Sequence, residues 1–302
     1  MAVEVPRVVE RIRLPSLGGR RETRERLLSA LQLTPATLFL LAFLVAPLAI
    51  FFAYSFWVTR SHVLVADWTL TQYKEGVTEK IWRDLLRNTV VIAITTAGIT
   101  VTLAYAFAHA LRFHLGRHQE ALLFLVLVAL FSGYLVRIYA WRTILGNEGI
   151  VNEGLIRLGL IDQPLSFLLF SRPAAILVLV NFLVPLAILP IYAALQNVRS
   201  EEVEAARDLG AGPFAAFRRV TLPLAWSGVF VAFAISFIIA AGDYVTPQLV
   251  GGTSGSMIGR AIANQFGVTF EWPRGAALAF LTLAFVLAIL AVLRAASARI
   301  VR

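Results

Sequence analysis

The stretch Glu201–Pro223, EEVEAARDLGAGPFAAFRRVTLP, is a polar island inside a very apolar chain. Its first nine residues are good helix formers with acidic residues in the first turn, where the helix dipole favours them. Ser200 is a candidate N-cap, and Gly210 can take the left-handed conformation that ends such a helix. Pro213 suits the first turn of a second short helix that reaches Val220. The stretch therefore predicts a helix–turn–helix between two apolar segments.

The composition of the whole chain is that of a membrane protein. Of its 302 residues, 59% are hydrophobic and only 15% are charged, and the mean hydropathy is +0.77. A soluble domain of this size is nearer half apolar and carries more charge. The chain has no cysteine, which excludes disulfides, thiolate catalysis and cysteine metal sites. Its net charge of +9 lies beside the apolar runs instead of on a basic, aromatic-rich surface, so a nucleic-acid partner is not expected.

Six apolar runs are each long enough to cross a bilayer as a helix. They lie at about residues 35–58, 89–111, 121–145, 173–195, 224–249 and 275–293. Strands are not expected, because a bilayer admits only helices or closed barrels. The prediction is an all-α integral membrane protein with six transmembrane helices, in which residues 34–302 form one domain and residues 1–33 a cytoplasmic N-terminal extension. A short interfacial helix is expected at Glu79–Arg87, and kinks are expected at Pro185 and Pro190.

The basic residues predict the orientation of these helices. With the N-terminus inside, sixteen Lys and Arg residues lie in the inner segments and eleven in the outer ones, while the acidic residues divide into nine and nine. Positive residues accumulate on the cytoplasmic side of membrane proteins. Both termini are therefore expected in the cytoplasm, and Glu201–Pro223 is expected to face the same side.

The spacing inside the polar island is specific. Glu204-Ala205-Ala206 is followed by three residues and Gly210, and nine further residues lead to Val220-Thr221-Leu222-Pro223. This pattern resembles the EAA loop of bacterial ABC importer permeases, in which a helix–turn–helix inserts into an ATPase subunit and transmits its movement. The resemblance implies an ATPase-coupling element formed by Glu204, Ala205, Ala206, Asp208, Gly210, Val220, Leu222 and Pro223. An ordinary cytoplasmic hairpin between two spans is the alternative.

The family resemblance also implies the partners and the division of labour. A permease of this kind works with a cytoplasmic ABC ATPase dimer, a second permease, expected as a distinct chain, and an extracytoplasmic solute-binding protein. The implied location is the bacterial cytoplasmic (inner) membrane and its lipid. The chain has no G-x-x-x-x-G-K-[ST] phosphate loop. It is therefore expected not to be an enzyme itself, with ATP hydrolysis in the separate ATPase, and no cofactor is expected.

Three further stretches resemble the spermidine/putrescine permease group, in the first of its two paired permeases. They are Arg137-Ile138-Tyr139 with Gly149-Ile150-Val151-Asn152, Gly242-Asp243-Tyr244-Val245-Thr246-Pro247, and Gln265-Phe266 before Trp272-Pro273-Arg274-Gly275-Ala276-Ala277. The resemblance implies a polyamine, or a similar small organic cation, as the solute. Related permeases carry opines, other small organic solutes or ferric iron, and these alternatives stay open. A membrane scaffold or channel without ATP coupling is a further alternative, which leaves the spacing from Glu204 to Pro223 unexplained.

Polar residues at membrane depth are candidates for the solute pathway, because each is costly there. The candidates are Asp243, Tyr244, Asn181 and Arg137. Flanking glycine and proline residues predict a helix break beside Asp243, where a carboxylate and Tyr244 can attract a cation. Four alternatives stay open. Asp243 caps the local turn or pairs with Arg137, Asn181 links two helices by a hydrogen bond, and Arg137 snorkels to the interface.

His114 and His118 have the i, i+4 spacing of two metal ligands on one helix face. No Glu follows as in H-E-x-x-H, and Gly116 weakens the helix between them. A solvated loop is the expected structure, and a metal site is not expected.

Overall fold

The computed structural model describes residues 32, 34–61 and 63–300, so the expected N-terminal extension at 1–33 lies almost wholly outside the described residues. The chain divides into two compact units, residues 1–53 and 54–302. In the first unit, the helix Thr34–Tyr54 is long and apolar enough to cross a membrane. It contains the π-helical turn η1 (Leu41–Val45) and continues as α2 (Ala46–Tyr54).

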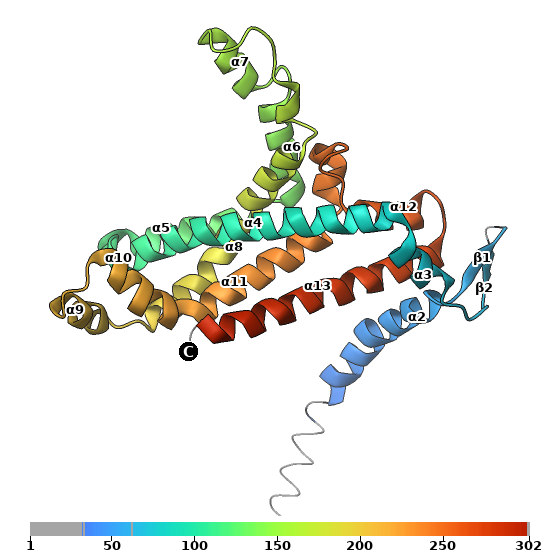
Figure 1. Cartoon of the computed structure of the whole chain (residues 1–302), viewed down its shortest axis with the longest axis horizontal. Helices are drawn as coiled ribbons and strands as arrows, with labels where there is room; N and C mark the ends of the chain where they lie inside the picture. The colour runs from blue at the N-terminus through green and yellow to red at the C-terminus, as the bar shows by residue number, and fades with distance from the viewer. Residues whose placement is uncertain (1–31, 33, 62, 301–302) are drawn as a thin grey trace, which may run out of the picture. The chain divides into compact units, whose positions relative to one another are not determined.

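The second unit is almost entirely helical (Figure 1). Its helices are α3 (Thr71–Thr78), α4 (Lys80–Phe113), α5 (Gln119–Phe131), α6 (Tyr134–Leu145), α7 (Ile150–Arg157), α8 (Arg172–Gln196), α9 (Ser200–Asp208), α10 (Pro213–Ala216), α11 (Leu222–Gly242), α12 (Ile258–Gly267) and α13 (Trp272–Ile300). Short 3-10 or π turns are η2 (Gly116–His118), η3 (Ser166–Leu168), η4 (Phe217–Thr221) and η5 (Pro247–Gly251). The expectation of no strands is wrong at one place, where β1 (Val58–Arg60) and β2 (Val63–Val65) form a short antiparallel hairpin.

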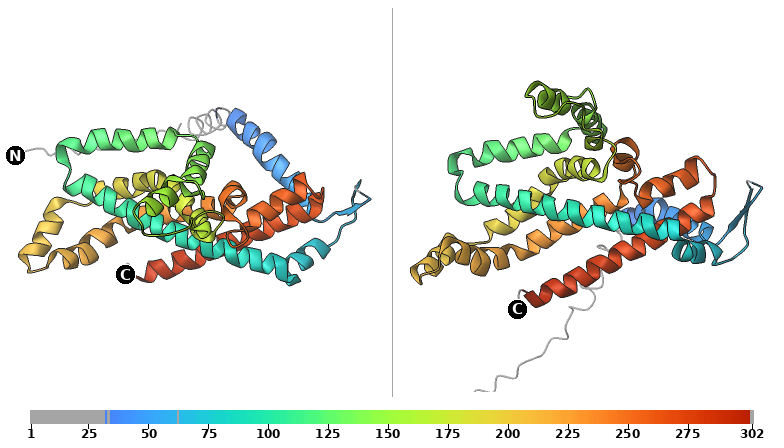
Figure 2. Two further views of the ribbon diagram at one scale, coloured as in Figure 1. Left: turned by 90° about the horizontal axis from the view of Figure 1, so that it is seen from above. Right: turned by 45° about the horizontal axis from the view of Figure 1, so that its top comes forward.

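The core of this unit lies where α4, α8 and α11 run side by side (Figures 1 and 2). The buried face of α4 consists largely of alanine and threonine at helical spacing, with Ala93, Ala97, Ala104 and Ala108 fully buried. Lipid tails are as apolar as leucine, so helices in a bilayer associate by close van der Waals packing, which small residues permit. The sequence of α4 therefore brings three helix backbones close together.

α8 and α11 approach each other closely at Gly228. A methyl group added there would lie 2.4 Å from the carbonyl oxygen of Pro190 and 2.5 Å from Cβ of Ala194. Real Cβ atoms do not approach other atoms so closely, so only glycine fits while the two helices keep this separation. The uninterrupted course of α8 through Pro185 and Pro190 places the Pro190 carbonyl at this contact.

The prediction of six membrane-length helices is confirmed for five, and the third expected span is different. Residues 116–131 and 134–157 pass the length and hydropathy test only together, and they meet at 90°. The helix stops because Ser132 and Gly133 have extended backbone, with ψ angles of 127° and 131°. Both serine and glycine have low helix propensity. The leucine, valine and phenylalanine residues on either side give no indication of a break. The third span, predicted at 121–145, is therefore bent near its middle, and the described residues hold six spans if this bent pair counts as one.

Two other boundaries also differ from the sequence prediction. The expected interfacial helix Glu79–Arg87 is not separate, because α4 begins at Lys80 and continues without interruption. The second arm of the polar island, expected to end near Val220, continues as one helix from Pro213 to Gly242. A π-helical turn, η4, ends two residues before Pro223. Such a turn locally widens the helix and accommodates a proline that lacks an N–H and crowds the preceding turn.

The Gly228 contact gives a matched test of the packing. We expect Gly228→Ala to lower the thermal stability of the purified protein, because the new methyl group forces α8 and α11 apart at a cost of about 1–3 kcal/mol. Gly98→Ala is the control, since a methyl group on Gly98 of α4 would meet nothing within 4 Å. Thermal unfolding in one detergent compares the two variants. Equal melting temperatures for both would contradict the assignment of Gly228 as a packing residue.

Candidate functional site

The first arm of the polar island is the helix α9, which begins one residue away from the predicted start. Ser200 was expected as the N-cap, but Arg199 occupies that position and Ser200 is the first helical residue. Glu202 replaces the expected serine cap: its carboxylate accepts hydrogen bonds from the Arg199 backbone N–H at 3.4 Å and from the Arg199 guanidinium at 3.0 Å. Glu201 and Glu202 lie in the first turn, where the helix dipole favours their charge.

The C-terminal end of α9 confirms the left-handed conformation expected of Gly210. Its φ angle is +86°, in the left-handed region. The Gly210 N–H donates to the Arg207 carbonyl at 2.8 Å, and the Ala211 N–H donates to the Ala206 carbonyl at 3.0 Å. These two bonds form a Schellman motif, which satisfies the last carbonyls of a helix and reverses the chain. The chain therefore leaves α9 in a fixed direction and enters α10 at Pro213.

The structure divides the predicted coupling residues into two groups. Those in or just after α9 are exposed or half-buried: Glu204, Ala205, Ala206, Asp208 and Gly210. Val220 in η4 and Leu222 and Pro223 at the start of α11 are half-buried, and Leu222 packs on the core. The first group is thus available to a partner, whereas the second joins the element to the helix bundle.

The tip of this element carries two apolar side chains that the sequence analysis did not single out. Leu209 is 90% exposed and Phe214 is 72% exposed, on either side of the Gly210 turn. An uncovered apolar tip on a polar helix pair is typical of a surface that binds another protein. Both residues flank the turn glycine within the polar island, and this position could have indicated in the sequence that their side chains are exposed.

The inner side of α9 faces the C-terminal end of α4. A cavity of about 240 Å³ lies between them, lined by His109, His114, Val203, Arg207 and Thr221 among others. Val203 packs on the core cluster of α4, α8 and α11. In the described part of the chain, no group of three or more His, Cys, Asp or Glu residues could hold a metal ion.

A second polar cluster surrounds Asp243, directly after the end of α11. The side chain of Asp243 is buried, with 8% of the residue exposed. Its carboxylate accepts hydrogen bonds from the backbone N–H groups of Val245 and Thr246, at 3.0 Å and 3.3 Å, and from the Tyr134 hydroxyl at 2.7 Å. Because the Tyr134 proton points at the carboxylate, Thr246 donates its own hydroxyl proton to Tyr134, at 2.6 Å. α11 ends at Gly242, as predicted, and Asp243 caps the turn that follows.

Arg137 lies next to this cluster but does not pair with Asp243. Its guanidinium reaches the backbone carbonyl of Asn181 at 3.5 Å and lies 5.8 Å from the ring centre of Phe182. The Phe182 ring in turn lies 4.5 Å from that of Tyr134. The ion pair between Arg137 and Asp243 is absent from the four ion pairs of the described residues, so that alternative is wrong.

The predicted pathway residues therefore lie near one another, and residues that the sequence did not indicate form the contacts between them. Asn181 is exposed, and its hydrogen bond to α6 is made by its backbone carbonyl instead of its side chain. Tyr244 is 50% exposed beside the buried Asp243. Tyr134 and Phe182 are aromatic residues within apolar runs, where sequence alone does not separate a contact residue from packing.

Known proteins resemble this chain along most of its length. The sequence profile of the family described as "Binding-protein-dependent transport system inner membrane component" matches residues 120–302. The spermidine/putrescine transport system permease protein PotB of Haemophilus influenzae is 35% identical over 179 residues, which are 59% of this chain and 62% of the relative. PotB of Escherichia coli is 32% identical over 209 residues, which are 69% of this chain and 75% of the relative. The chain thus spans about three fifths to three quarters of these relatives.

The fold also resembles a solved transporter. A chain of the crystal structure of a bacterial ABC transporter that imports the acidic polysaccharide alginate superimposes with a TM-score of 0.73 at 17% sequence identity. The superposition covers 94% of this chain and 99% of the other. At this identity the likeness shows the fold, which is the all-α architecture of ABC importer permeases.

The turn at Gly210 can be tested directly. We expect Gly210→Val to weaken the turn by on the order of 1–2 kcal/mol, because a β-branched residue resists the left-handed conformation. Hydrogen exchange of the peptide spanning residues 205–212 should then be about five to thirty times faster. Gly212→Val is the control, since Gly212 has a φ of −65° and open space around it. Unchanged exchange in Gly210→Val, or equal acceleration in both variants, would contradict the Schellman turn.

Proposed function

Because this chain belongs to the family of binding-protein-dependent transport system inner membrane components, we propose that it is the permease of an ABC importer for polyamines such as spermidine and putrescine. Membership makes it a multi-pass inner membrane protein and a permease subunit instead of an ATPase. Two relatives that are 35% and 32% identical bear the name of a spermidine/putrescine permease, which supports the choice of solute.

The observation that carries the choice of a cation is the Asp243 cluster. A buried carboxylate held by three hydrogen-bond donors lies next to the half-exposed Tyr244. Arg137 is engaged elsewhere, over Phe182, so the carboxylate charge is not neutralised by an ion pair within the described residues. A carboxylate and an aromatic face together attract an ammonium group. Capping and solute attraction are therefore compatible roles of the same side chain.

The proposed assembly contains a cytoplasmic ABC ATPase dimer, a second permease that is a distinct chain, and an extracytoplasmic solute-binding protein. The exposed tip of α9, with Leu209 and Phe214, suits docking to the ATPase. Movement of α9 would reach α4 through Val203 and α11 through the helix that continues from Pro213. The Gly210→Val variant should then also lose co-purification of the ATPase, whereas Gly212→Val should keep it. A scaffold without ATP coupling would bind no ATPase in either case.

The proposed orientation has both termini and α9 in the cytoplasm, and it is supported by the excess of basic residues in the inner segments. The chain has no cysteine, so single cysteines can report on orientation. We expect an impermeant thiol reagent added outside intact cells to label a cysteine at position 70 or 160 but not at position 115. Permeabilised cells give the control for reactivity at position 115. Labelling of position 115 in intact cells would overturn the orientation.

The role of Asp243 in uptake is tested by two variants. We expect Asp243→Asn to raise the KM for spermidine about fivefold to tenfold, because it keeps the size and part of the capping but removes the charge. Tyr134→Phe removes one hydrogen bond to the carboxylate but keeps the charge, so it should leave the KM nearly unchanged. Uptake by membrane vesicles that contain the whole importer measures both.

The alternatives make different predictions in the same assay. Normal spermidine uptake by Asp243→Asn would leave Asp243 as a cap only. Equal losses in Asp243→Asn and Tyr134→Phe would indicate a structural role for the cluster. If the parent importer takes up an opine or ferric iron but not spermidine, the proposed solute is wrong while the permease assignment stands.

A further inference from the structure

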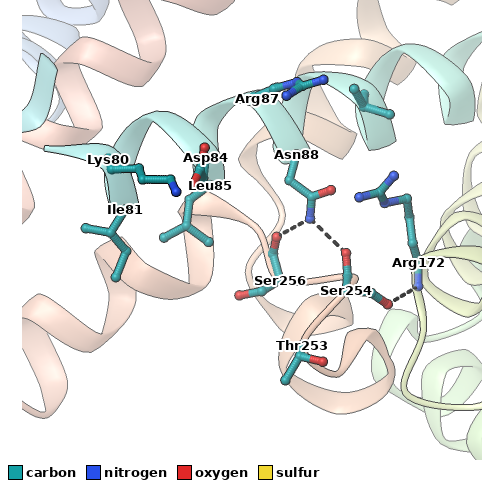
Figure 3. A pocket seen from close by; sticks show the side chains of 11 residues that line it. Lys80, Ile81, Asp84, Leu85, Arg87, Asn88, Arg172, Thr253, Ser254 and Ser256 are labelled. Carbon is teal, nitrogen blue, oxygen red and sulfur yellow. Dashed lines mark hydrogen bonds between the residues drawn. The ribbon is translucent and has the colours of Figure 1, made fainter. Parts of the chain in front are cut away.

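A cavity of about 790 Å³ is lined by residues at the start of α4 (Figure 3), at the end of the helix bundle opposite α9 (Figure 1). Its walls come from the first turns of α4, the start of α8 and the loop before α12. The polar and charged residues that line it are Lys80, Asp84, Arg87, Asn88, Arg172, Thr253, Ser254 and Ser256. None of them belongs to the coupling element or to the Asp243 cluster.

The loop that closes this cavity is held in place by hydrogen bonds from two helices. The Asn88 side chain donates to the carbonyl oxygens of Ser254, at 3.0 Å, and Ser256, at 2.6 Å. The backbone N–H of Arg172 donates to the Ser254 hydroxyl at 3.2 Å. Figure 3 shows these three bonds joining the loop to α4 and α8. The cavity is therefore formed by well-anchored backbone.

The cations of the cavity are not used by the fold. Lys80, Arg87 and Arg172 form no ion pair with any residue that the structure describes, and Asp84 is the single carboxylate among the lining residues. By contrast, Arg274 at the start of α13 is paired with Glu75 at 3.0 Å. Three cations, one carboxylate and the hydroxyl groups of Thr253 and Ser256 suit a phosphate group. The positive charge excludes a polyamine as the ligand of this cavity.

An apolar groove of about 470 Å³ adjoins the basic cavity, and Arg87 and Val91 line both. The groove runs between α3, α4 and α13, and its apolar lining consists of Val77, Leu86, Val90, Val91, Leu281 and Phe285. A cationic cavity that continues into an apolar groove matches a molecule with an anionic head and an acyl chain.

The level of the cavity in the bilayer fits the same ligand. No Asp, Glu, Lys or Arg lies in α4 from Asn88 to Leu111, and none lies in α8 after Arg172. Arg87 and Arg172 therefore stand at the border between the charged and apolar parts of two neighbouring spans. Phospholipid phosphates lie at this border, where basic side chains attract anionic lipids.

We propose that the basic cavity and the groove together bind one anionic phospholipid, with its phosphate on Arg87 and Arg172 and an acyl chain along Val90 and Phe285. Free phosphate or an acidic polypeptide would use the cations but leave the groove unexplained. The site is independent of the proposed solute, and it requires only that the chain spans a membrane.

Native mass spectrometry of the full chain in detergent tests the site with dioleoylphosphatidylglycerol and dioleoylphosphatidylcholine. We expect the parent protein to prefer the anionic lipid. Arg87→Gln/Arg172→Gln should weaken phosphatidylglycerol binding at least about tenfold, since the double variant removes both charge-assisted contacts to the lipid phosphate. The single variant Arg87→Gln should show part of that loss. Arg260→Gln is the matched control, because Arg260 lines a neighbouring cavity and neither of these two.

Val90→Trp fills the groove without a change of charge and should also weaken phosphatidylglycerol binding. Equal binding of both lipids by the parent, or a preference that survives the double variant, would overturn the proposal. Displacement of the lipid by millimolar inorganic phosphate would assign the cavity to a free anion. Displacement by poly-glutamate at an equal carboxylate concentration would assign it to an acidic protein surface. Either displacement would also overturn the lipid assignment.

Discussion

In a bilayer every backbone N–H and C=O needs a partner within the protein, because hydrocarbon offers none. Within the helices these groups bond to one another. Two places need other partners, because there the helical backbone stops within an apolar region. After Gly242, the Asp243 carboxylate accepts the N–H groups of Val245 and Thr246. The buried carboxylate therefore satisfies backbone N–H groups at the break, and these N–H groups in turn stabilise the carboxylate. Removing either would leave polar groups unsatisfied.

The other break, at Ser132 and Gly133, determines where α6 lies. α6 leaves α5 at 90°, and its first residue, Tyr134, bonds to Asp243. Arg137, one turn later in α6, reaches the Asn181 carbonyl of α8. A straight third span would carry both residues along a different line. The polar cluster therefore depends on a bend that lies a few residues away from it in sequence, and the α6 side chains link α8 to the turn after α11.

The sequence predicted most of what depends on local chemistry. Membrane-length apolar runs, the left-handed Gly210 and the end of α11 before Asp243 follow from residue types at known positions, and the structure has them. Prediction from the sequence failed where the local structure depends on contacts with neighbouring helices. A pair of small residues such as Ser132–Gly133 is also tolerated inside some membrane helices, so residue type alone did not predict the break within the apolar run 121–145. For the same reason Tyr134 and Phe182, which assemble the cluster around Asp243, had no sequence signal of their own. The second arm of the polar island was expected to end near Val220, but the helix continues through the π turn η4 into α11.

The packing of α4, α8 and α11 constrains how the two ends of the bundle can influence each other. At Gly228 the helices are in backbone contact, and the alanine face of α4 leaves little space for a side chain to change rotamer. Close-packed interiors of small residues shift as rigid bodies instead of deforming gradually. A displacement of α9 at one end should therefore move the three helices together, carrying the α8 residues Asn181 and Phe182 with them. The turn at Asp243 directly follows α11, and the Tyr134 hydroxyl of α6 donates a hydrogen bond to it. The turn therefore lies between the group of three packed helices and α6. A rigid-body movement of the three helices relative to α6 would therefore change the surroundings of the Asp243 side chain, which is hydrogen-bonded to α6 and to the turn that follows α11.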